Sequence, residues 1–357
     1  MGKVLVTGCN GLIGSQCVEY FCKLGMDVVG IDNDMRSYFF GENSSTKEVG
    51  DLLKSKYDNF EYHDIDIRNL NDLSYIFESN DFELIIHSAA QPSHDWAAKE
   101  PITDFEVNAL GTVYMLESYR QSCPDATFIF TSTNKVYGDR PNYLNLVDGG
   151  SRIEHHGGDV DENMSIDNCL HSVFGSSKVA ADVMVQEYGK YFGLNTMVFR
   201  GGCLTGPSHK GAELHGFLSY LIKCMVHSKH YTIFGNGKQV RDNIHSWDLV
   251  NLFWHCHQSP RSGEVYNIGG GRENSTSILE AIDRVNKILR EHDLPEWKDY
   301  TIEEDNWRIG DHKWYISDLS KVRSHYPEWE IKYSLNDLIE EMTLVEISNL
   351  NIRKILK

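Results

Sequence analysis

A short apolar run followed by three spaced glycines, close to the start of the chain, constrains the fold most. Residues 3–7 read Lys-Val-Leu-Val-Thr, and residues 8–14 read Gly-Cys-Asn-Gly-Leu-Ile-Gly. An amphipathic run then extends to Leu24, and a second apolar run over residues 27–31 is followed by Asp32. This order predicts a strand, a tight glycine turn, a helix and a second strand parallel to the first.

The glycine turn predicts a site for a dinucleotide. Where side chains are missing, backbone amides can approach a pyrophosphate at the N-terminus of the helix, where the helix dipole favours anions. Asp32 would accept hydrogen bonds from a ribose 2′-hydroxyl and would repel the 2′-phosphate of NADP. A glycine pattern alone is weak evidence, but the strands, helix and carboxylate around this one specify NAD as the cofactor.

The composition excludes several other classes of protein. The 357 residues include 41% hydrophobic and 11% aromatic residues, as in ordinary globular proteins, and the net charge of −18 repels nucleic acid and anionic lipid. No apolar run approaches the roughly 18 residues that span a bilayer. The eight cysteines form no CxxC pair, which is typical of reduced thiols. We therefore expect a cytoplasmic protein that binds neither nucleic acid nor membrane.

Strand and helix patterns alternate up to about residue 200, which predicts an α/β protein with a Rossmann-like, doubly wound parallel sheet. We expect residues 1–200 to form the NAD-binding domain and residues 201–357 to form a smaller C-terminal α/β substrate domain. Residues 241–268 are expected to rejoin the first domain.

Several motifs resemble those of the extended short-chain dehydrogenase/reductase family, which includes NAD-dependent nucleotide-sugar epimerases and dehydratases. The Gly-x-x-Gly-x-x-Gly spacing of residues 8–14 is the first of them. The others, in the family's order, are Asp66-Ile67-Arg68, His87-Ser88-Ala89-Ala90-Gln91, Val107-Asn108-Ala109-Leu110-Gly111-Thr112, residues 128–138, residues 233–245 and residues 307–313. Each motif is weak alone, but their order and spacing together indicate the family over nearly the whole chain.

The resemblance implies two sets of binding residues. Those for NAD are Gly8, Asn10, Gly11, Leu12, Ile13, Gly14, Asp32, Asn33, Arg36, Asp66, Ile67, Ser88, Ala89, Ala90, Gln91, Asn108, Thr131, Lys178 and Arg200. Those for the nucleotide sugar are Thr133, Asn134, Phe174, Gly202, Cys203, Glu213, His215, Gly216, Arg241 and Arg308, with the two late arginines facing the diphosphate. In the family, the residue at Thr133 hydrogen-bonds the sugar oxygen that is oxidised.

Position 174 departs from the family pattern. The family uses a Tyr-x-x-x-Lys pair on one helix face, where the ammonium lowers the pKa of the phenol. Phe174 replaces that tyrosine, while Lys178 is present. Phenylalanine cannot take a proton, so an enzyme needs a replacement base: Lys135, His171 or Lys178 itself. We favour Lys135, which the strand of Thr133 brings to the sheet edge, followed by His171, whose ordinary pKa suits neutral pH.

Within the family, the chain resembles the CDP-tyvelose (CDP-paratose) 2-epimerases through residues 132–138, His171-Ser172, Ser177-Lys178 and residues 235–242. The resemblance implies an epimerase that oxidises the sugar transiently to a ketone and then reduces it again. Asn134-Lys135 stands where 4,6-dehydratases carry an Asp-Glu pair, so elimination of water by that acid/base route is not expected. Two alternatives stay open: an oxidoreductase that releases a keto sugar, and a protein that binds NAD and nucleotide sugar without chemistry.

The remaining expectations concern partners and metals. A CDP-sugar is the favoured ligand, with UDP- and GDP-sugars as alternatives. Two predicted helices, residues 102–123 and 177–192, correspond to those of the family's dimer interface, so we expect a homodimer. The pair His155-His156 has no ligand partner at metal-binding spacing, and no metal site is predicted.

Overall fold

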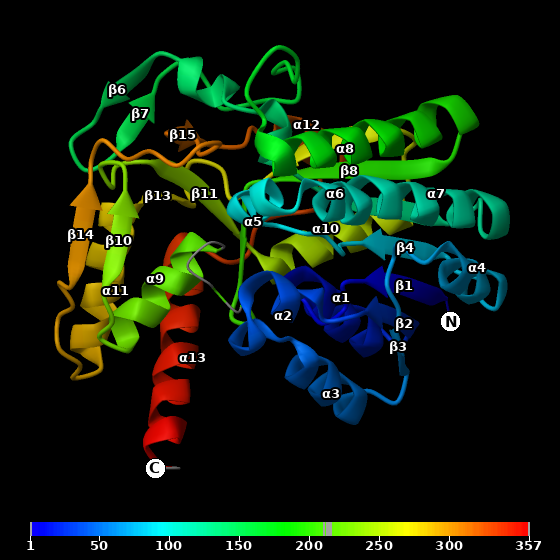
Figure 1. The fold of residues 1–357 in the computed structure, drawn as a ribbon, viewed down its shortest axis with the longest axis horizontal. Coiled ribbons are helices and arrows are strands. Elements are labelled where there is room, and N and C mark those ends of the chain that lie inside the picture. Colours follow the sequence, from blue (N-terminus) through cyan, green and yellow to red (C-terminus); the bar gives the residue numbers. More distant parts are fainter. Residues whose placement is uncertain (1, 210, 212–215, 356–357) are drawn as a thin grey trace.

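A parallel sheet forms the centre of the protein (Figure 1). The computed structural model describes residues 2–209, 211 and 216–355, and within them seven parallel strands follow the order β12-β8-β5-β4-β1-β2-β3. The strands are β1 (Lys3–Thr7), β2 (Asp27–Asp32), β3 (Phe60–Asp64), β4 (Leu84–His87), β5 (Thr127–Thr133), β8 (Asn195–Gly201) and β12 (Glu264–Ile268).

The direction of winding reverses beside β1, which pairs with β2 on one side and with β4 on the other. The chain runs from β1 through β2 to β3 at one edge, then returns to β4 and proceeds through β5 and β8 to β12. Loops at the carboxyl ends of strands diverge at such a reversal and leave a crevice between them. The predicted doubly wound fold is confirmed, and its crevice is where a ligand is expected.

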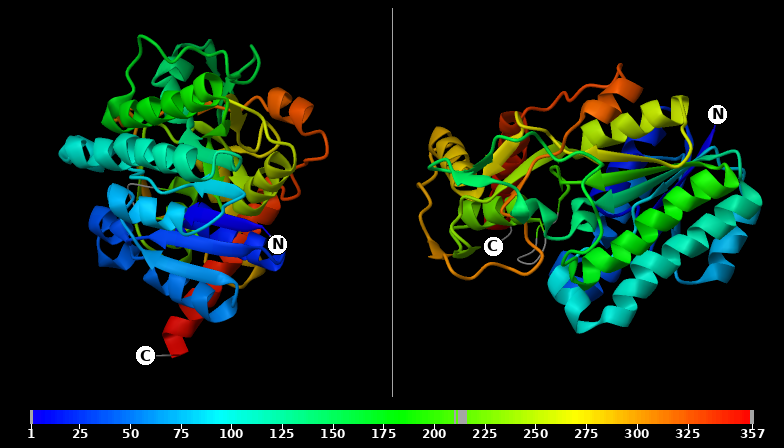
Figure 2. Two further views of the ribbon diagram at one scale, coloured as in Figure 1. Left: turned by 90° about the vertical axis from the view of Figure 1, so that its right-hand side faces the viewer. Right: turned by 90° about the horizontal axis from the view of Figure 1, so that it is seen from above.

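Alternate residues of the strands face two separate cores. On β1, Val4 and Val6 pack in one cluster and Leu5 in the other. The first cluster is covered by α1 (Leu12–Lys23), α3 (Lys47–Lys56), α10 (Ser246–Gln258) and α12 (Ser320–His325). The second is covered by α4 (Leu70–Glu78), α7 (Gly111–Ser122) and α8 (Ser172–Phe192). Figure 2 shows the sheet between these two layers.

A smaller lobe follows β8 and has its own apolar core (Figure 1). Its helices and outer strands are α9 (Phe217–Val226), β10 (Tyr231–Phe234), α11 (Ile278–Glu291), β14 (Tyr300–Glu303) and α13 (Leu335–Ile355). A mixed sheet of β9 (Cys203–Thr205), β11 (Val240–His245), β13 (Ser275–Ser277) and β15 (Trp314–Tyr315) borders it. Of the segment predicted to rejoin the first domain, α10 and β12 lie on the large sheet, whereas β11 lies in the mixed sheet.

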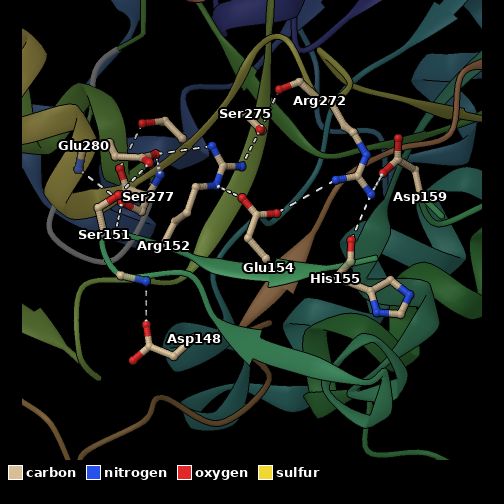
Figure 3. Close-up of polar contacts among 12 residues, drawn as sticks. Asp148, Ser151, Arg152, Glu154, His155, Asp159, Arg272, Ser275, Ser277 and Glu280 are labelled. Carbon is tan, nitrogen blue, oxygen red and sulfur yellow. Dashed lines mark hydrogen bonds and ion pairs between the residues drawn. The ribbon is translucent and has the colours of Figure 1, made fainter. Parts of the chain in front are cut away.

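The hairpin of β6 (Leu146–Asp148) and β7 (Ile153–His155) is tied to the beginning of α11 by a polar network (Figure 3). Arg152 contacts Glu154 at 2.8 Å and Glu280 at 3.4 Å, and it donates to Ser275 at 2.7 Å. Glu280 also completes a capping box with Ser277 at the start of α11. Charged side chains thus order a segment whose sequence shows no regular pattern.

The helix α8 begins at Ser172, earlier than the predicted start at residue 177. The reason is a local cap: Ser172 Oγ accepts the Gly175 N–H at 3.2 Å, so the first turn already has a partner for one amide. Ser172 itself has φ = 62°, in the left-handed region. This backbone turn sharply redirects the chain into the helix.

A buried ion pair fastens α8 to β8. Arg200 donates through Nε and Nη2 to the two carboxylate oxygens of Asp182, at 3.0 and 2.9 Å, and Asp182 also accepts the Ser132 hydroxyl at 2.6 Å. Arg200 further donates to the Tyr137 hydroxyl at 3.1 Å. The structure therefore uses Arg200, one of the residues expected at NAD, inside the protein rather than in the cavity lining.

We predict that Asp182→Ala lowers the free energy of unfolding by about 3–5 kcal/mol, because it leaves the Arg200 charge buried without its partner. Urea unfolding followed by circular dichroism measures the change. Asp283→Ala, at an exposed position of α11, is the matched control and is expected to stay within about 0.5 kcal/mol. Equal effects of the two substitutions would contradict a special role for the buried pair.

Candidate active site

A cavity of about 490 Å³ opens at the carboxyl ends of the strands, between the large sheet and the smaller lobe. Its lining begins at Gly8 and ends at Asp311, so both parts of the chain contribute to it. The volume lies in the range of small-ligand sites. Most of the residues predicted for NAD and for substrate meet in this one cavity.

The glycine turn leaves room for a ligand against the backbone. Gly8 has φ = 68°, and a Cβ there would lie 2.9 Å from the backbone of Ala89. A Cβ on Gly14 would lie 2.0 Å from the Gly8 carbonyl oxygen, so the helix can start this close only without side chains. Gly8, Gly11, Leu12, Ile13 and Gly14 line the cavity, as a pyrophosphate site at a helix N-terminus requires.

A carboxylate lies at the end of β2, beside this turn. Asp32 accepts the Asn10 N–H at 3.0 Å and the Asp34 N–H at 2.8 Å, and burial raises its pKa. Asp32, Asn33 and Arg36 line the cavity, whereas Asn10 is buried behind it. The arrangement fits a ribose with a free 2′-hydroxyl, because a second negative group would approach Asp32 in a desolvated place.

Residues predicted to contact the adenine and nicotinamide sides of NAD also line the cavity. Asp66 and Ile67 line the cavity at one end, and Ser88, Ala89, Ala90 and Thr131 line it further along. Gln91 and Asn108 do not line it. They bond to each other, with the Gln91 N–H donating to Asn108 Oδ1 at 2.9 Å, and Asn108 Nδ2 reaches Ser177 Oγ at 3.1 Å. Their role in the structure is to join the loop after β4 to α8.

Two lysines and a threonine occupy the middle of the cavity lining. Lys178 Nζ donates to the Thr131 carbonyl at 2.9 Å, and Lys135 Nζ donates to the Gly310 carbonyl at 2.7 Å and lies 3.4 Å from Asp311 Oδ1. Burial lowers the pKa of each lysine to about 8. At that value a lysine can exchange a proton near neutral pH, which an ordinary exposed lysine cannot. Thr133, at the end of β5, lies beside them in the lining.

His171 does not reach this cavity. Its Nε2 lies 2.9 Å from the Val136 carbonyl and 3.5 Å from Cys169 Sγ, and it is absent from the lining. His171 precedes Phe174 by three residues, but its imidazole lies against the Val136 carbonyl and not in the lining.

A different histidine, His94, lies where Phe174 meets the cavity. The two rings are 4.9 Å apart between centroids at an interplanar angle of 68°, and His94 Nδ1 lies 2.7 Å from Ser172 Oγ. Burial, with a further effect of Lys135, lowers the pKa of His94 to about 3. The sequence did not predict a role for His94. The signal that could have identified it is its position shortly after Gln91, at the start of the short helix α5 (His94–Lys99) that follows the carboxyl end of β4.

The other end of the lining is rich in cations. Arg241 and Arg308 both line the cavity, and Arg308 pairs with Asp95 while its guanidinium lies 5.7 Å from the Phe234 ring centre. Burial acts against ionisation of Asp311, but Lys135 and the two arginines lower its pKa overall. Two arginines here can meet the charge of a diphosphate.

The remaining predicted substrate residues divide into two groups. Asn134, Phe174, Gly202, Cys203 and Gly216 line the cavity. Glu213 and His215 lie outside the residues that the structure describes. Across the described residues there is no cluster of three or more potential metal ligands, and no helix is both long and apolar enough to cross a membrane.

Known proteins similar to this chain are epimerases and dehydratases of nucleotide sugars. The profile of the NAD dependent epimerase/dehydratase family matches residues 4–269. A CDP-paratose 2-epimerase of Salmonella typhi is 32% identical over 354 residues, covering 95% of this chain and 98% of the relative. A UDP-glucuronate 4-epimerase of Thermodesulfobacterium geofontis is 26% identical over 358 residues, covering 100% of both.

Solved structures agree over nearly the full length. A UDP-glucose 4-epimerase of Thermotoga maritima with UDP-glucose superposes with a TM-score of 0.78 at 25% identity, covering 99% of this chain and 100% of the other. A Tyr-to-Phe variant of the UDP-glucuronic acid 4-epimerase of Bacillus cereus, solved with UDP-4-deoxy-4-fluoro-glucuronic acid and NAD, has a TM-score of 0.78 at 27% identity and coverages of 98% and 99%.

We predict that Asp32→Asn weakens NAD⁺ binding roughly 10- to 100-fold, because a charged acceptor is lost. The ratio of the affinity for NAD⁺ to the affinity for NADP⁺ should fall as well. Calorimetric titration with each dinucleotide measures both quantities. Asp64→Asn is the matched control: Asp64 pairs with Asp32 in the register of β2 and β3 but is exposed and outside the lining. Unchanged NAD⁺ affinity in the Asp32 variant would remove this residue from the ribose site.

Proposed function

Because the chain belongs to the NAD dependent epimerase/dehydratase family, we propose that it epimerises the sugar that is attached to the diphosphate of a nucleotide sugar. The proposed reaction is CDP-sugar 2-epimerisation by transient oxidation to a keto sugar and re-reduction. The supporting observation is a single cavity with a dinucleotide cradle at one end, two arginines at the other, and Thr133, Lys135 and Lys178 between them.

Transient oxidation is needed because a C–H bond without a neighbouring carbonyl is too weakly acidic for direct proton removal. The glycine turn and Asp32 would hold NAD⁺, which would supply a reversible hydride acceptor for the carbinol carbon while the ketone presents one face and then the other. Thr133 then holds the sugar oxygen, and neutral Lys135 accepts the hydroxyl proton and gives it back. Lys178 orients the nicotinamide ribose from its position on α8. The net change is inverted configuration, with no cofactor consumed.

Asn134 supports epimerisation over dehydration. It is buried at the end of β5, in the lining, and its amide cannot exchange the proton that elimination of water requires. The second candidate is an oxidoreductase that releases the keto sugar, and a binding protein without chemistry is the third. Retention of a buried and a partly buried lysine, each with a lowered pKa, favours an active enzyme over the third candidate.

The nucleotide is proposed from similarity. The Salmonella typhi relative acts on a CDP-sugar, so CDP is favoured, with UDP and GDP as alternatives. We also propose a cytoplasmic homodimer. Apolar side chains on the adjacent helices α6 (Pro101–Phe105) and α8, among them Ile102, Phe105 and Val183, are exposed in the single chain and would be covered by a second copy.

The function is tested by identifying the nucleotide released on denaturation and then incubating the enzyme with CDP-, UDP- and GDP-sugars in deuterated water. An epimer without solvent deuterium at carbon and without accumulating NADH supports the proposal, because the hydride returns from the cofactor. Stoichiometric NADH with a ketone supports the oxidoreductase. Deuterium at the inverted carbon would contradict hydride return.

We predict that Lys135→Met lowers kcat roughly 10²- to 10⁴-fold, because the proton acceptor is lost. In the unaltered enzyme kcat/KM should rise with pH around 8, since the ammonium must lose its proton first and about one lysine in ten is neutral at pH 7. The groups that set this pKa beside burial are Asp311, Arg241 and Cys203.

The same rise should disappear from the residual activity of Lys135→Met, which distinguishes Lys135 from Lys178, whose pKa is also about 8. Lys313→Met, which removes a nearby exposed lysine outside the lining, is the control. Full turnover by Lys135→Met, or an unaltered pH profile, would exclude Lys135 as the base.

A further inference from the structure

The phenylalanine in α8 leaves the sugar oxygen without a phenolic hydroxyl, but its ring is fully packed. Phe174 is buried at 6% exposure, and the edge contact with His94 brings an imidazole to the same part of the cavity lining. The pair therefore places a polar heterocycle beside the ring that cannot hydrogen-bond.

His94 is held in a fixed orientation from two sides. On one side Ser172 Oγ lies 2.7 Å from Nδ1. On the other, the backbone of Gly310 packs on the ring so closely that a Cβ there would lie 3.1 Å from Nδ1 and 3.2 Å from Cε1. Gly310 has φ = 82°, so this approach suits glycine. A ring fixed in this way can present its second nitrogen in one direction.

The hydrogen bonds around Ser172 favour one tautomer of the imidazole. Ser172 Oγ already accepts the Gly175 N–H at 3.2 Å, and His94 Nδ1 is the one acceptor in contact with it among the described residues. The hydroxyl therefore donates to Nδ1, and the proton of the neutral ring resides on Nε2. Nε2 has no hydrogen-bond partner within the described part of the chain and is not sealed from solvent, so it is open to a ligand in the cavity.

The ring is uncharged at neutral pH. Burial lowers the pKa of His94 to about 3, Lys135 and Arg308 act in the same direction, and Asp311 acts against them. An uncharged imidazole held in a desolvated site is a hydrogen-bond donor that does not compete with Lys135 for the proton. A donor of this kind, aimed where negative charge develops on oxygen, stabilises the transition state.

We propose that His94 is a catalytic residue that donates its Nε2–H to the sugar oxygen being oxidised and re-reduced, at the place the family gives to a tyrosine hydroxyl. The inference rests on the proposed epimerase function. Lys135 exchanges the proton, while His94 stays neutral throughout and stabilises the oxygen as it passes between hydroxyl and carbonyl. Ser172 is a positioning residue, which fixes the tautomer.

The test compares His94→Leu, which removes the donor, with His94→Gln, whose amide N–H can reach a similar place. We expect His94→Leu to lower kcat roughly 10²- to 10³-fold with KM for the nucleotide sugar within about threefold. The kcat of His94→Gln should be at least tenfold higher than that of His94→Leu. The double variant Phe174→Tyr/His94→Leu, which adds a hydroxyl, should show the same recovery of kcat. His156→Leu, an exposed histidine, is the control.

Equal losses in the Leu and Gln variants, or a kcat of His94→Leu within threefold of the unaltered enzyme, would overturn the role of His94 while leaving the epimerase proposal intact. A second readout does not depend on turnover. Nitrogen-15 NMR should show Nε2 protonated and Nδ1 unprotonated in the free protein, and the Nε2 resonance should shift on addition of CDP-sugar with NAD⁺.

In Ser172→Ala the tautomer preference should be lost and kcat should fall less than in His94→Leu. A reversed tautomer in the unaltered protein, or an unmoved resonance on saturation with ligand, would contradict the proposal. If the unaltered enzyme forms no epimer from any sugar nucleotide, the function has failed, and the NMR titration still decides whether His94 contacts the ligand.

Discussion

The attachment of α8 to the end of β5 is the constraint on which the site depends. Lys178 Nζ donates to the Thr131 carbonyl, and one turn later Asp182 receives the Ser132 hydroxyl and pairs with Arg200. Each contact lies in a buried place, where an unpaired charge costs several kcal/mol. Because the helix cannot slide without breaking them, Phe174 and Thr133 are held against the same cavity.

Phe174 is buried at this place and cannot exchange a proton. Its phenyl ring fills the space beside the cavity but carries no hydroxyl. The polar groups that remain within the lining are held by a loop of the smaller lobe: Gly310 receives Lys135 and packs on His94, and Arg308 pairs with Asp95. The smaller lobe thus helps to orient the groups for which we propose a role in the chemistry, in addition to the two arginines of the cavity lining.

The sequence predicted the dinucleotide half of the protein well because that half is encoded by backbone requirements. Gly8 and Gly14 are needed for close approaches that no other residue permits, and the periodicity of the strands sets the sheet. The predicted family, parallel sheet and NAD dependence are confirmed. Some polar side chains that were predicted for the site lie outside the cavity lining, because a partner distant in the chain determines where each side chain lies. Arg200 lies against Asp182, and Asn108 lies against Gln91.

His94 is a residue that the sequence did not predict for the site, again because its contacts come from distant parts of the chain. The role proposed for it depends on Ser172 and Phe174 at the start of α8 and on Gly310, none of which is near it in sequence. A motif scan registers the missing tyrosine as a lost function, since it compares one position with one expected residue. The folded chain places the His94 imidazole against Phe174, in a cavity lining that also contains two lysines of lowered pKa. In a cavity whose other parts are retained, a single replaced residue indicates redistribution of the proton chemistry more strongly than its loss.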